Sequence, residues 1–233
     1  EPHPGPRFLC WNSNGLNSAA QRNNFFSKIK IENGFKPISA IFIQEHNIKP
    51  DNTKLIHDDA KRHGLFIFIA PIPAYGLKGG TAIIIPRDQL ELKKGETRCE
   101  AETRVRRSMV TSGAGRVTRI DTSVENQPFR LIAAYAPAAA GERTAFFTNT
   151  LGPHLNKTTI LGIDANCVPD VSLDVRSQSR SAYENSGTND LQNILITADL
   201  IDVAREWLEN APFFTCFKKT QGDNLTSTRL DRI

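Results

Sequence analysis

The chain has 233 residues, of which 39% are hydrophobic and 23% are charged, and its net charge is +4. These values are those of a folded globular protein and exclude a disordered or fibrous chain. No apolar run approaches the roughly 18 residues that a membrane-spanning helix needs, so we expect no membrane partner. The small positive excess permits a polyanionic partner without requiring one.

Short β-rich runs alternate with helical stretches along the whole chain. The runs are rich in Val, Ile, Phe, Tyr and Thr and are bordered by turn-forming residues, which predicts strands at Arg7–Asn12, Ser39–Gln44, Leu65–Ala70, Thr81–Pro86, Val117–Ser123, Phe129–Ala136, Thr158–Asp164 and Phe213–Phe217, with a last one beginning near Arg229. Apolar periodicity and capping residues predict helices at Ala19–Asn33, Asn52–His63, Glu142–Leu155, Asp190–Ala198 and Val203–Leu208.

Several of these strands are almost continuously apolar, which indicates that both of their faces are buried. Ser39–Ile43 and Thr81–Ile85 are the clearest examples. Strands of this kind with helices spread between them are typical of an α/β protein whose sheets lie inside helical layers. Periodicity alone leaves open whether there is one sheet or two. The four cysteines form no CxxC pair, so we expect reduced thiols in an intracellular protein and no structural zinc.

Polar side chains follow the apolar strands at the points where the strands end. Asn12 and Asn14 follow the first strand, Gln44 and Glu45 follow the second, and Tyr135, Asp164 with Asn166, and Asp231 follow later ones. Any one of these residues is most simply a turn former or a solvated strand end. Together they supply the carboxylate, amide and phenol oxygens that suit Mg²⁺ or Mn²⁺, an ion that polarises phosphate groups.

The order of these motifs resembles the exonuclease III-like endonuclease/exonuclease/phosphatase family. The resemblance rests on five segments: Trp11–Leu16, Ile43-Gln44-Glu45, Tyr135-Ala136-Pro137, Gly162–Asn166 and Arg229-Leu230-Asp231. In the fourth segment, Ile163 separates the glycine and aspartate that are adjacent in the family's usual motif. It implies a four-layered α/β sandwich, with two packed mixed β-sheets flanked by helices, formed by a single domain over residues 1–233.

Within that family the chain is most similar to the apurinic-like endonuclease domain of non-LTR (LINE-type) retrotransposons. The segments Asn12–Asn17, Gly79–Ile84 and Asn185–Asp190 carry this closer resemblance. It implies a Mg²⁺-dependent endonuclease that nicks double-stranded DNA and leaves a 3′-hydroxyl to prime reverse transcription. It also implies a reverse transcriptase C-terminal in the same polypeptide and action in the nucleus.

The resemblance assigns a role to each matching residue. Glu45, with Asn12 and Asn14, would hold the metal, and Asn12 would also take part in catalysis. Asp164 would orient or deprotonate the attacking water, while Asn166 and Tyr135 would hydrogen-bond the scissile phosphate. Further roles go to Thr215, which would support the site, and to Asp231, which would orient a catalytic histidine. The family's closing Ser-Asp-His motif has no match here, so the domain is expected to stop short of its last strand and that motif.

DNA contacts are expected from basic residues in loops near the strand ends. Arg106, Arg107 and Arg116 lie in a stretch without acidic residues, Thr103–Ile120, which Ser112–Gly115 divides as the tip of a hairpin. A basic hairpin of this kind could follow the phosphates, and the alternative is a strand edge protected by charge. Thr215 and Lys218 are further DNA-binding candidates.

Three other functions remain open from the sequence. One is a repair endonuclease that acts at abasic sites, and another is a phosphatase of the same fold. The third is a catalytically inactive module that binds DNA or protein. The unmatched histidine motif favours the inactive module, whereas the presence of Glu45, Asp164, Asn166 and Asp231 argues against it.

Overall fold

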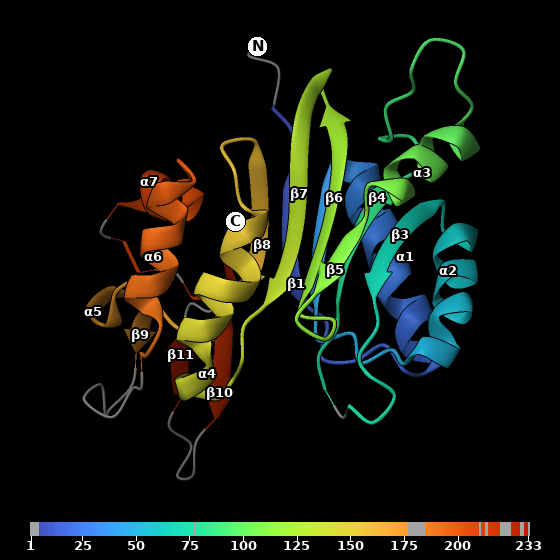
Figure 1. The fold of residues 1–233 in the computed structure, drawn as a ribbon. Coiled ribbons are helices and arrows are strands. Elements are labelled where there is room, and N and C mark those ends of the chain that lie inside the picture. Colours follow the sequence, from blue (N-terminus) through green and yellow to red (C-terminus); the bar gives the residue numbers. More distant parts are fainter. Residues whose placement is uncertain are drawn as a thin grey trace.

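The computed structural model describes residues 5–76, 78–176, 185–209, 211–212, 214–219, 225–228 and 231–232, and the side chains of those up to residue 215. Two β-sheets pack face to face in the middle of the molecule, and helices lie against their outer sides (Figure 1). This arrangement confirms the predicted four-layered α/β sandwich. It also decides the question that periodicity left open, because the strands form two main sheets.

The first sheet has four strands and is mixed. Its order is β1 (Phe8–Asn12), β2 (Ala40–Gln44), β4 (Thr81–Pro86) and β3 (Leu65–Ala70). β1 and β2 run parallel, whereas β2 with β4 and β3 with β4 are antiparallel. Every residue of β2, β3 and β4 is buried, as their continuous apolar sequences predicted for strands covered on both faces.

The second sheet has five described strands, with the parallel pair β7–β8 near its middle. Its order is β12 (Asp231–Arg232), β8 (Thr159–Asp164), β7 (Gln127–Tyr135), β6 (Val117–Val124) and β5 (Val110–Ser112). The other neighbours are antiparallel. Because β1 with β2 and β7 with β8 are parallel pairs, the carboxyl ends of each pair lie at one edge of its sheet.

Three apolar cores hold the four layers together. The core between the sheets contains Phe42, Phe68 and Leu131. Gly162 lets the two sheets approach closely, because a Cβ at this position would lie 2.3 Å from the Cβ of Phe42. The other two cores bury the outer face of each sheet against helices, around Phe26 on one side and Phe147 on the other.

The helices follow the sequence prediction in number and place with two exceptions. α1 (Ala19–Phe35) and α2 (Thr53–Arg62), which follows the short turn η1 (Pro50–Asn52), cover the first sheet. The second sheet is covered by α4 (Ala140–Ala145), the π-helical η2 (Phe146–Leu151) and α6 (Thr188–Thr197), with η3 (Gly152–His154) and α7 (Val203–Leu208) alongside. No helix in the described part of the chain is both long and apolar enough to cross a bilayer.

The unpredicted helices are α3 (Arg98–Arg107) and the short α5 (Val171–Asp174). In α3, Thr97 and Glu100 form a reciprocal capping box, and Ala101 with Val105 pack against the core between the sheets. Thr103–Arg107, expected as part of a hairpin, is therefore the end of this helix. Only two of its ten residues are buried, so the helix has a weak apolar pattern in sequence.

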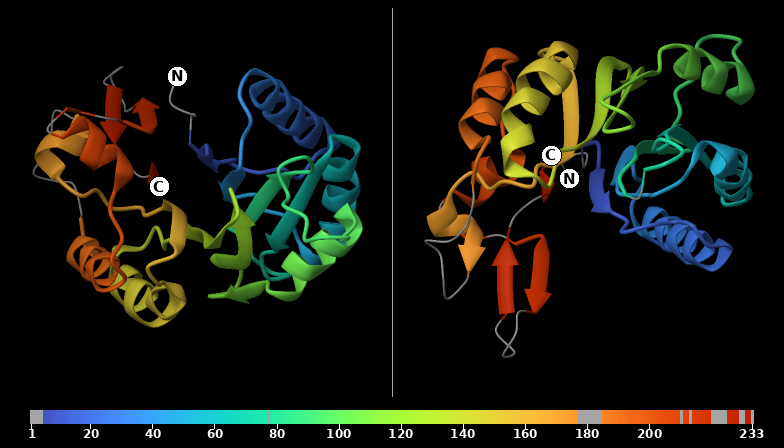
Figure 2. Two further views of the ribbon diagram at one scale, coloured as in Figure 1. Left: turned by 90° about the horizontal axis from the view of Figure 1, so that it is seen from above. Right: turned by 60° about the horizontal axis from the view of Figure 1, so that its bottom comes forward.

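A small antiparallel sheet of β10 (Cys216–Lys219), β11 (Leu225–Thr228) and β9 (Val175–Arg176) stands beside the sandwich (Figure 2). The predicted strand Phe213–Phe217 overlaps β10 only at Cys216 and Phe217, and the sequence did not predict β9 or β11. The predicted strand near Arg229 appears as β12, while Arg229 and Leu230 of the last motif lie outside the described residues.

Candidate active site

Polar residues from both sheets meet where β1, β2, β7 and β8 end. Asn12 is the last residue of β1 and Asp164 is the last residue of β8. The Asn12 side-chain amide donates a hydrogen bond to Asp164 Oδ2 at 2.9 Å, across 152 residues of sequence. This bond joins the two sheets at the edge where the motif residues gather, because each residue belongs to a different sheet.

A second bond between the sheets joins Tyr135 to Glu45. The Tyr135 hydroxyl, at the end of β7, donates to the carboxylate of Glu45, which directly follows β2. Burial raises the pKa of Tyr135 well above its usual range, and the bond to Glu45 and the negative charges of Glu45 and Asp164 raise it further. The phenol therefore keeps its proton at neutral pH and stays a hydrogen-bond donor.

The backbone enters the left-handed region one or two residues after the ends of three of these strands. Asn14, Glu45 and Asn166 have φ angles of 46°, 52° and 50°. Asparagine tolerates this region better than most residues, whereas glutamate does so at a cost of about 1–2 kcal/mol. Such strain persists only where the surroundings hold it in place, and it is common at functional sites.

Short polar contacts hold the strand-end turns in shape. Asn12 Oδ1 accepts a hydrogen bond from the backbone N–H of Asn14 at 3.0 Å, and Asp164 Oδ1 accepts one from Asn166 at 3.1 Å. The Asn166 amide donates to the carbonyl of Ala136 at 2.9 Å. The Asp164 carboxylate thus receives a donor on each oxygen, which fixes its orientation.

His46, the neighbour of Glu45, is a buried structural residue. Its Nδ1 accepts from the backbone N–H of Ile48 at 2.9 Å, so its protonated Nε2 donates to the carbonyl of Ala70 at 3.1 Å. Burial lowers the pKa of His46 to about 4, which keeps the ring neutral. Its bond to Ala70 holds the turn after β2 against the end of β3.

Arg116 lies at the border of the site. Its guanidinium carbon is 5.3 Å from the centre of the Tyr135 ring, and its Nη1 donates to the Tyr135 carbonyl at 3.3 Å. Arg116 follows the turn at Gly113–Gly115 between β5 and β6, the turn that the sequence predicted. Among the arginines expected to contact DNA, Arg116 is thus placed beside the motif residues.

The remaining candidates lie elsewhere or are described by backbone alone. Arg106 and Arg107 are the last two residues of α3, which lies beside β3 and β4 (Figure 1). Arg106 is engaged there, 5.1 Å over the Phe68 ring and 2.8 Å from Glu102. Thr215 directly precedes β10 and Lys218 is within it. The backbone of Asp231 pairs directly with that of Asp164, which brings this chain segment to the site.

The donor set suits a hard divalent cation. Glu45 contributes the carboxylate. Asn12 pairs in the sheet with Gln44, the residue before Glu45, and Asn14 is exposed in the turn that follows Asn12. Within the described residues no group of three or more His, Cys, Asp or Glu side chains could hold a metal ion. Mg²⁺ does not need such a group, because one or two carboxylates with water and substrate phosphate oxygens commonly bind it. A zinc site would need more nitrogen or sulfur ligands.

Comparison with solved structures shows the same fold in nucleases. The chain is similar to the AP endonuclease LMAP from Leishmania major, with a TM-score of 0.70 and 14% identity over 100% of this chain and 79% of that one. An AP endonuclease from Archaeoglobus fulgidus matches with a TM-score of 0.62 and 15% identity, over 95% of this chain and 85% of that one.

The same fold occurs in the endonuclease domain of TRAS1, a telomere-specific non-LTR retrotransposon. Its TM-score is 0.55 at 13% identity, over 89% of this chain and 77% of that one. No protein-family model matches the sequence, and no curated protein matches it significantly. The chain therefore has the exonuclease III-like, AP endonuclease fold that its motifs predicted.

Proposed function

We propose that this chain is a Mg²⁺-dependent endonuclease domain that nicks double-stranded DNA. The observation that carries the proposal is the pair of bonds from Asn12 to Asp164 and from Tyr135 to Glu45. They bring four residues from four strand ends to one place, and each of the four has a use in hydrolysing a phosphodiester. The fold shared with AP endonucleases supports this activity.

Asp164 is the base in the proposed reaction. The Asn12 amide and the Asn166 backbone N–H orient its carboxylate so that it accepts a proton from the attacking water. The water oxygen bonds to phosphorus while the bond from phosphorus to the 3′-oxygen breaks. The departing 3′-oxygen takes a proton from solvent, which leaves a 3′-hydroxyl and a 5′-phosphate.

Tyr135 and Asn166 would stabilise the negative charge that grows on the phosphate oxygens. Asn166 has a second amide N–H besides the one bound to Ala136, and the Tyr135 hydroxyl would turn from Glu45 to the phosphate. Glu45, with Asn12 and Asn14, would hold Mg²⁺, which when bound neutralises a phosphate oxygen. Asp231, whose backbone pairs with that of Asp164, is proposed to orient a histidine at the site. Arg116 is proposed to contact the DNA backbone beside Tyr135, and Arg106, Arg107, Thr215 and Lys218 remain predicted contacts.

The proposed biological role is target nicking by a non-LTR retrotransposon in the nucleus, with the new 3′-hydroxyl priming reverse transcription. The motif resemblance and the fold shared with the TRAS1 endonuclease domain support it. A C-terminal reverse transcriptase in the same polypeptide is part of the proposal. The main rival is repair at abasic sites, which the fold shared with the Leishmania and Archaeoglobus enzymes favours equally.

One assay separates these functions. The chain is incubated with Mg²⁺ and either intact supercoiled plasmid or a duplex that carries one abasic site. D164A is the variant expected to be inactive. D88N, which alters an exposed carboxylate outside the candidate site, is the control expected to be as active as the parent. Nicking of intact plasmid without preference for the abasic site supports the retrotransposon role. Strong preference for the abasic site supports repair. Equal behaviour of D164A and the parent on both substrates contradicts the nuclease proposal and favours an inactive binding module.

A further inference from the structure

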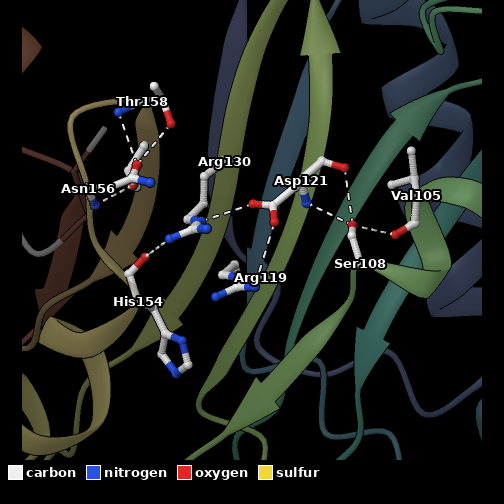
Figure 3. Close-up of polar contacts among 9 residues, drawn as sticks. Val105, Ser108, Arg119, Asp121, Arg130, His154, Asn156 and Thr158 are labelled. Carbon is white, nitrogen blue, oxygen red and sulfur yellow. Dashed lines mark hydrogen bonds and ion pairs between the residues drawn. The ribbon is translucent and has the colours of Figure 1, made fainter.

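A second cluster of charged residues lies on the other side of the second sheet from the candidate active site. In β6, Ile120 points into the core between the sheets, so its neighbours Arg119 and Asp121 point outward. Arg130 of β7 is directly opposite Asp121 in the antiparallel pair and therefore shares this outer face. Figure 3 shows the three side chains together on one side of the strands, with His154 next to them.

The cluster has more positive than negative charge. Asp121 accepts a hydrogen bond from Arg130 Nε at 2.9 Å, while the distance from its other oxygen to Arg119 Nη2 is 3.6 Å. One carboxylate is thus shared by two guanidinium groups. Arg130 gains a further partner, because its Nη1 donates to the His154 carbonyl at 3.1 Å.

Arg119 is the group that the cluster leaves unsatisfied. Its side chain makes no hydrogen bond with any residue of the described ranges, its ion pair with Asp121 is long at 3.6 Å, and its Nε is buried without an acceptor among those residues. Only 20% of the Arg119 side chain is exposed, so water screens its charge poorly. A partly buried guanidinium whose N–H groups lack hydrogen-bond acceptors is unfavourable, and an anionic ligand would relieve that cost.

Neutral donors stand beside Arg119. His154 Nε2 and Ser112 Oγ are 3.0 Å apart, and Ser112 is on β5, the strand that pairs with the Arg119 end of β6. Burial lowers the pKa of His154, and the positive charges of Arg119 and Arg130 lower it further. The His154 imidazole is therefore close enough to Arg119 and Arg130 for their positive charges to act on it.

We propose that Arg119, Ser112 and His154 form a second anion site, which binds a phosphate group on the outer face of β5 and β6. A guanidinium matches the oxygens of a phosphate with two parallel hydrogen bonds. The Ser112–His154 pair adds one further donor at its border, since the other donor hydrogen of the pair is used in the bond between the two residues. The phosphate can belong to a nucleic-acid backbone or be free in solution. This site is independent of the proposed nuclease activity, because it faces away from Asn12, Glu45, Tyr135 and Asp164.

The test follows the His154 ring signal by NMR while inorganic phosphate is added at constant ionic strength, with chloride as the balancing ion. H154Q identifies the signal among the five histidines. We expect a saturable shift and a rise in the pKa of His154, because bound phosphate offsets the charge of Arg119. No metal, DNA or catalytic turnover is needed, so failure of the nuclease proposal would leave this result unaffected.

R119Q and K61Q are the matched variants, since each removes one positive charge and Lys61 is exposed on α2. We expect R119Q to weaken phosphate binding at least tenfold, as loss of a charged hydrogen-bond donor does, and K61Q to bind as the parent does. The melting temperature of R119Q should change little, because the substitution removes only the 3.6 Å ion pair with Asp121, which keeps its bond to Arg130. Absence of a saturable shift, or an equal shift in R119Q, would overturn the proposal.

A duplex DNA arm then identifies the source of the phosphate. If R119Q lowers DNA affinity and reduces its salt dependence relative to K61Q, the site binds the nucleic-acid backbone. If R119Q changes phosphate binding alone, the site binds free phosphate. Both results support a phosphate site, and the first also extends the DNA-binding surface to the outer face of the second sheet.

Discussion

The side chains of Asn12 and Asp164 are joined by a 2.9 Å hydrogen bond although 152 residues separate them in the chain. Asn12 belongs to the first sheet and Asp164 to the second. The bond therefore forms only when the two sheets are correctly packed, and the orientation of the Asp164 carboxylate depends on that packing. Damage to the core between the sheets should consequently reduce activity before the chain unfolds.

Glu45 is expected to control metal binding. E45Q removes the negative charge but keeps an oxygen that can accept from Tyr135. We expect the rise in melting temperature on addition of Mg²⁺ to disappear in E45Q, because ligand stabilisation requires binding to the folded state. E142Q, which alters an exposed glutamate on α4, should respond as the parent does. An unchanged Mg²⁺ response in E45Q would remove Glu45 from the metal site.

The Tyr135 hydroxyl is expected to act on the reaction and not on the fold. Y135F should reduce the nicking rate by about 10²–10³-fold, the usual effect of losing one donor to a developing anion. Y75F is the control, since the Tyr75 side chain is 92% exposed in the loop between β3 and β4. Single-turnover assays measure the nicking rate of both variants. Equal nicking rates for Y135F and Y75F would show that the Tyr135 hydroxyl has no part in catalysis.

Gly80 is required because His46 occupies the space beside it. Gly80 has a φ of +84°, and an added Cβ would lie 2.3 Å from His46 Cε1. G80A should lower the free energy of unfolding by about 2–5 kcal/mol, from left-handed strain and overpacking. G141A is the control, because an added Cβ there meets nothing within 4 Å. Urea denaturation measures both; a neutral G80A would mean that the turn after β2 can move.

Asp59 holds a buried charge that anchors the chain after β1. Its carboxylate contacts Arg22, whose Nη1 also donates to the carbonyls of Leu16 and Asn17 at 3.2 and 2.7 Å. D59A should cost about 3–5 kcal/mol of unfolding free energy, since it leaves Arg22 buried without its counter-charge. R62A removes the exposed partner of Asp59, so it should cost at most about 1 kcal/mol. Similar costs for the two variants in urea denaturation would contradict this account.

His46 should make the fold sensitive to mild acid. Its pKa is about 4 in the folded chain against 6.5 in the unfolded one, so the unfolded state binds the proton more readily. The contribution of the neutral ring to stability is complete above pH 6.5 and is lost as the pH falls towards 4. The difference amounts to about 3 kcal/mol at roughly 1.4 kcal/mol per pKa unit. Urea denaturation between pH 7 and 4 should show this loss in the parent and not in H46Q.

Much of the architecture was predictable because it depends on local patterns. β3 and β4 have the predicted bounds, since a run of buried Ile and Phe between turn residues has few other solutions. α3 was missed because only Ala101 and Val105 of its residues are buried, although Thr97 and Glu100 carry a capping signal that could have located it. β5 and β9 are too short for any period to be visible.

The sequence by itself determined which residues end the apolar strands and which chemistry their oxygens suit. Only the tertiary structure decided that Asn12 meets Asp164 and that Tyr135 meets Glu45, because these contacts depend on strand order and on how one sheet packs on the other. It also separated Arg116, beside Tyr135, from Arg106 on α3, and placed Arg119 on the outer face. Side-chain direction in a strand alternates with each residue, so neighbours in sequence such as Arg116 and Arg119 can serve different surfaces.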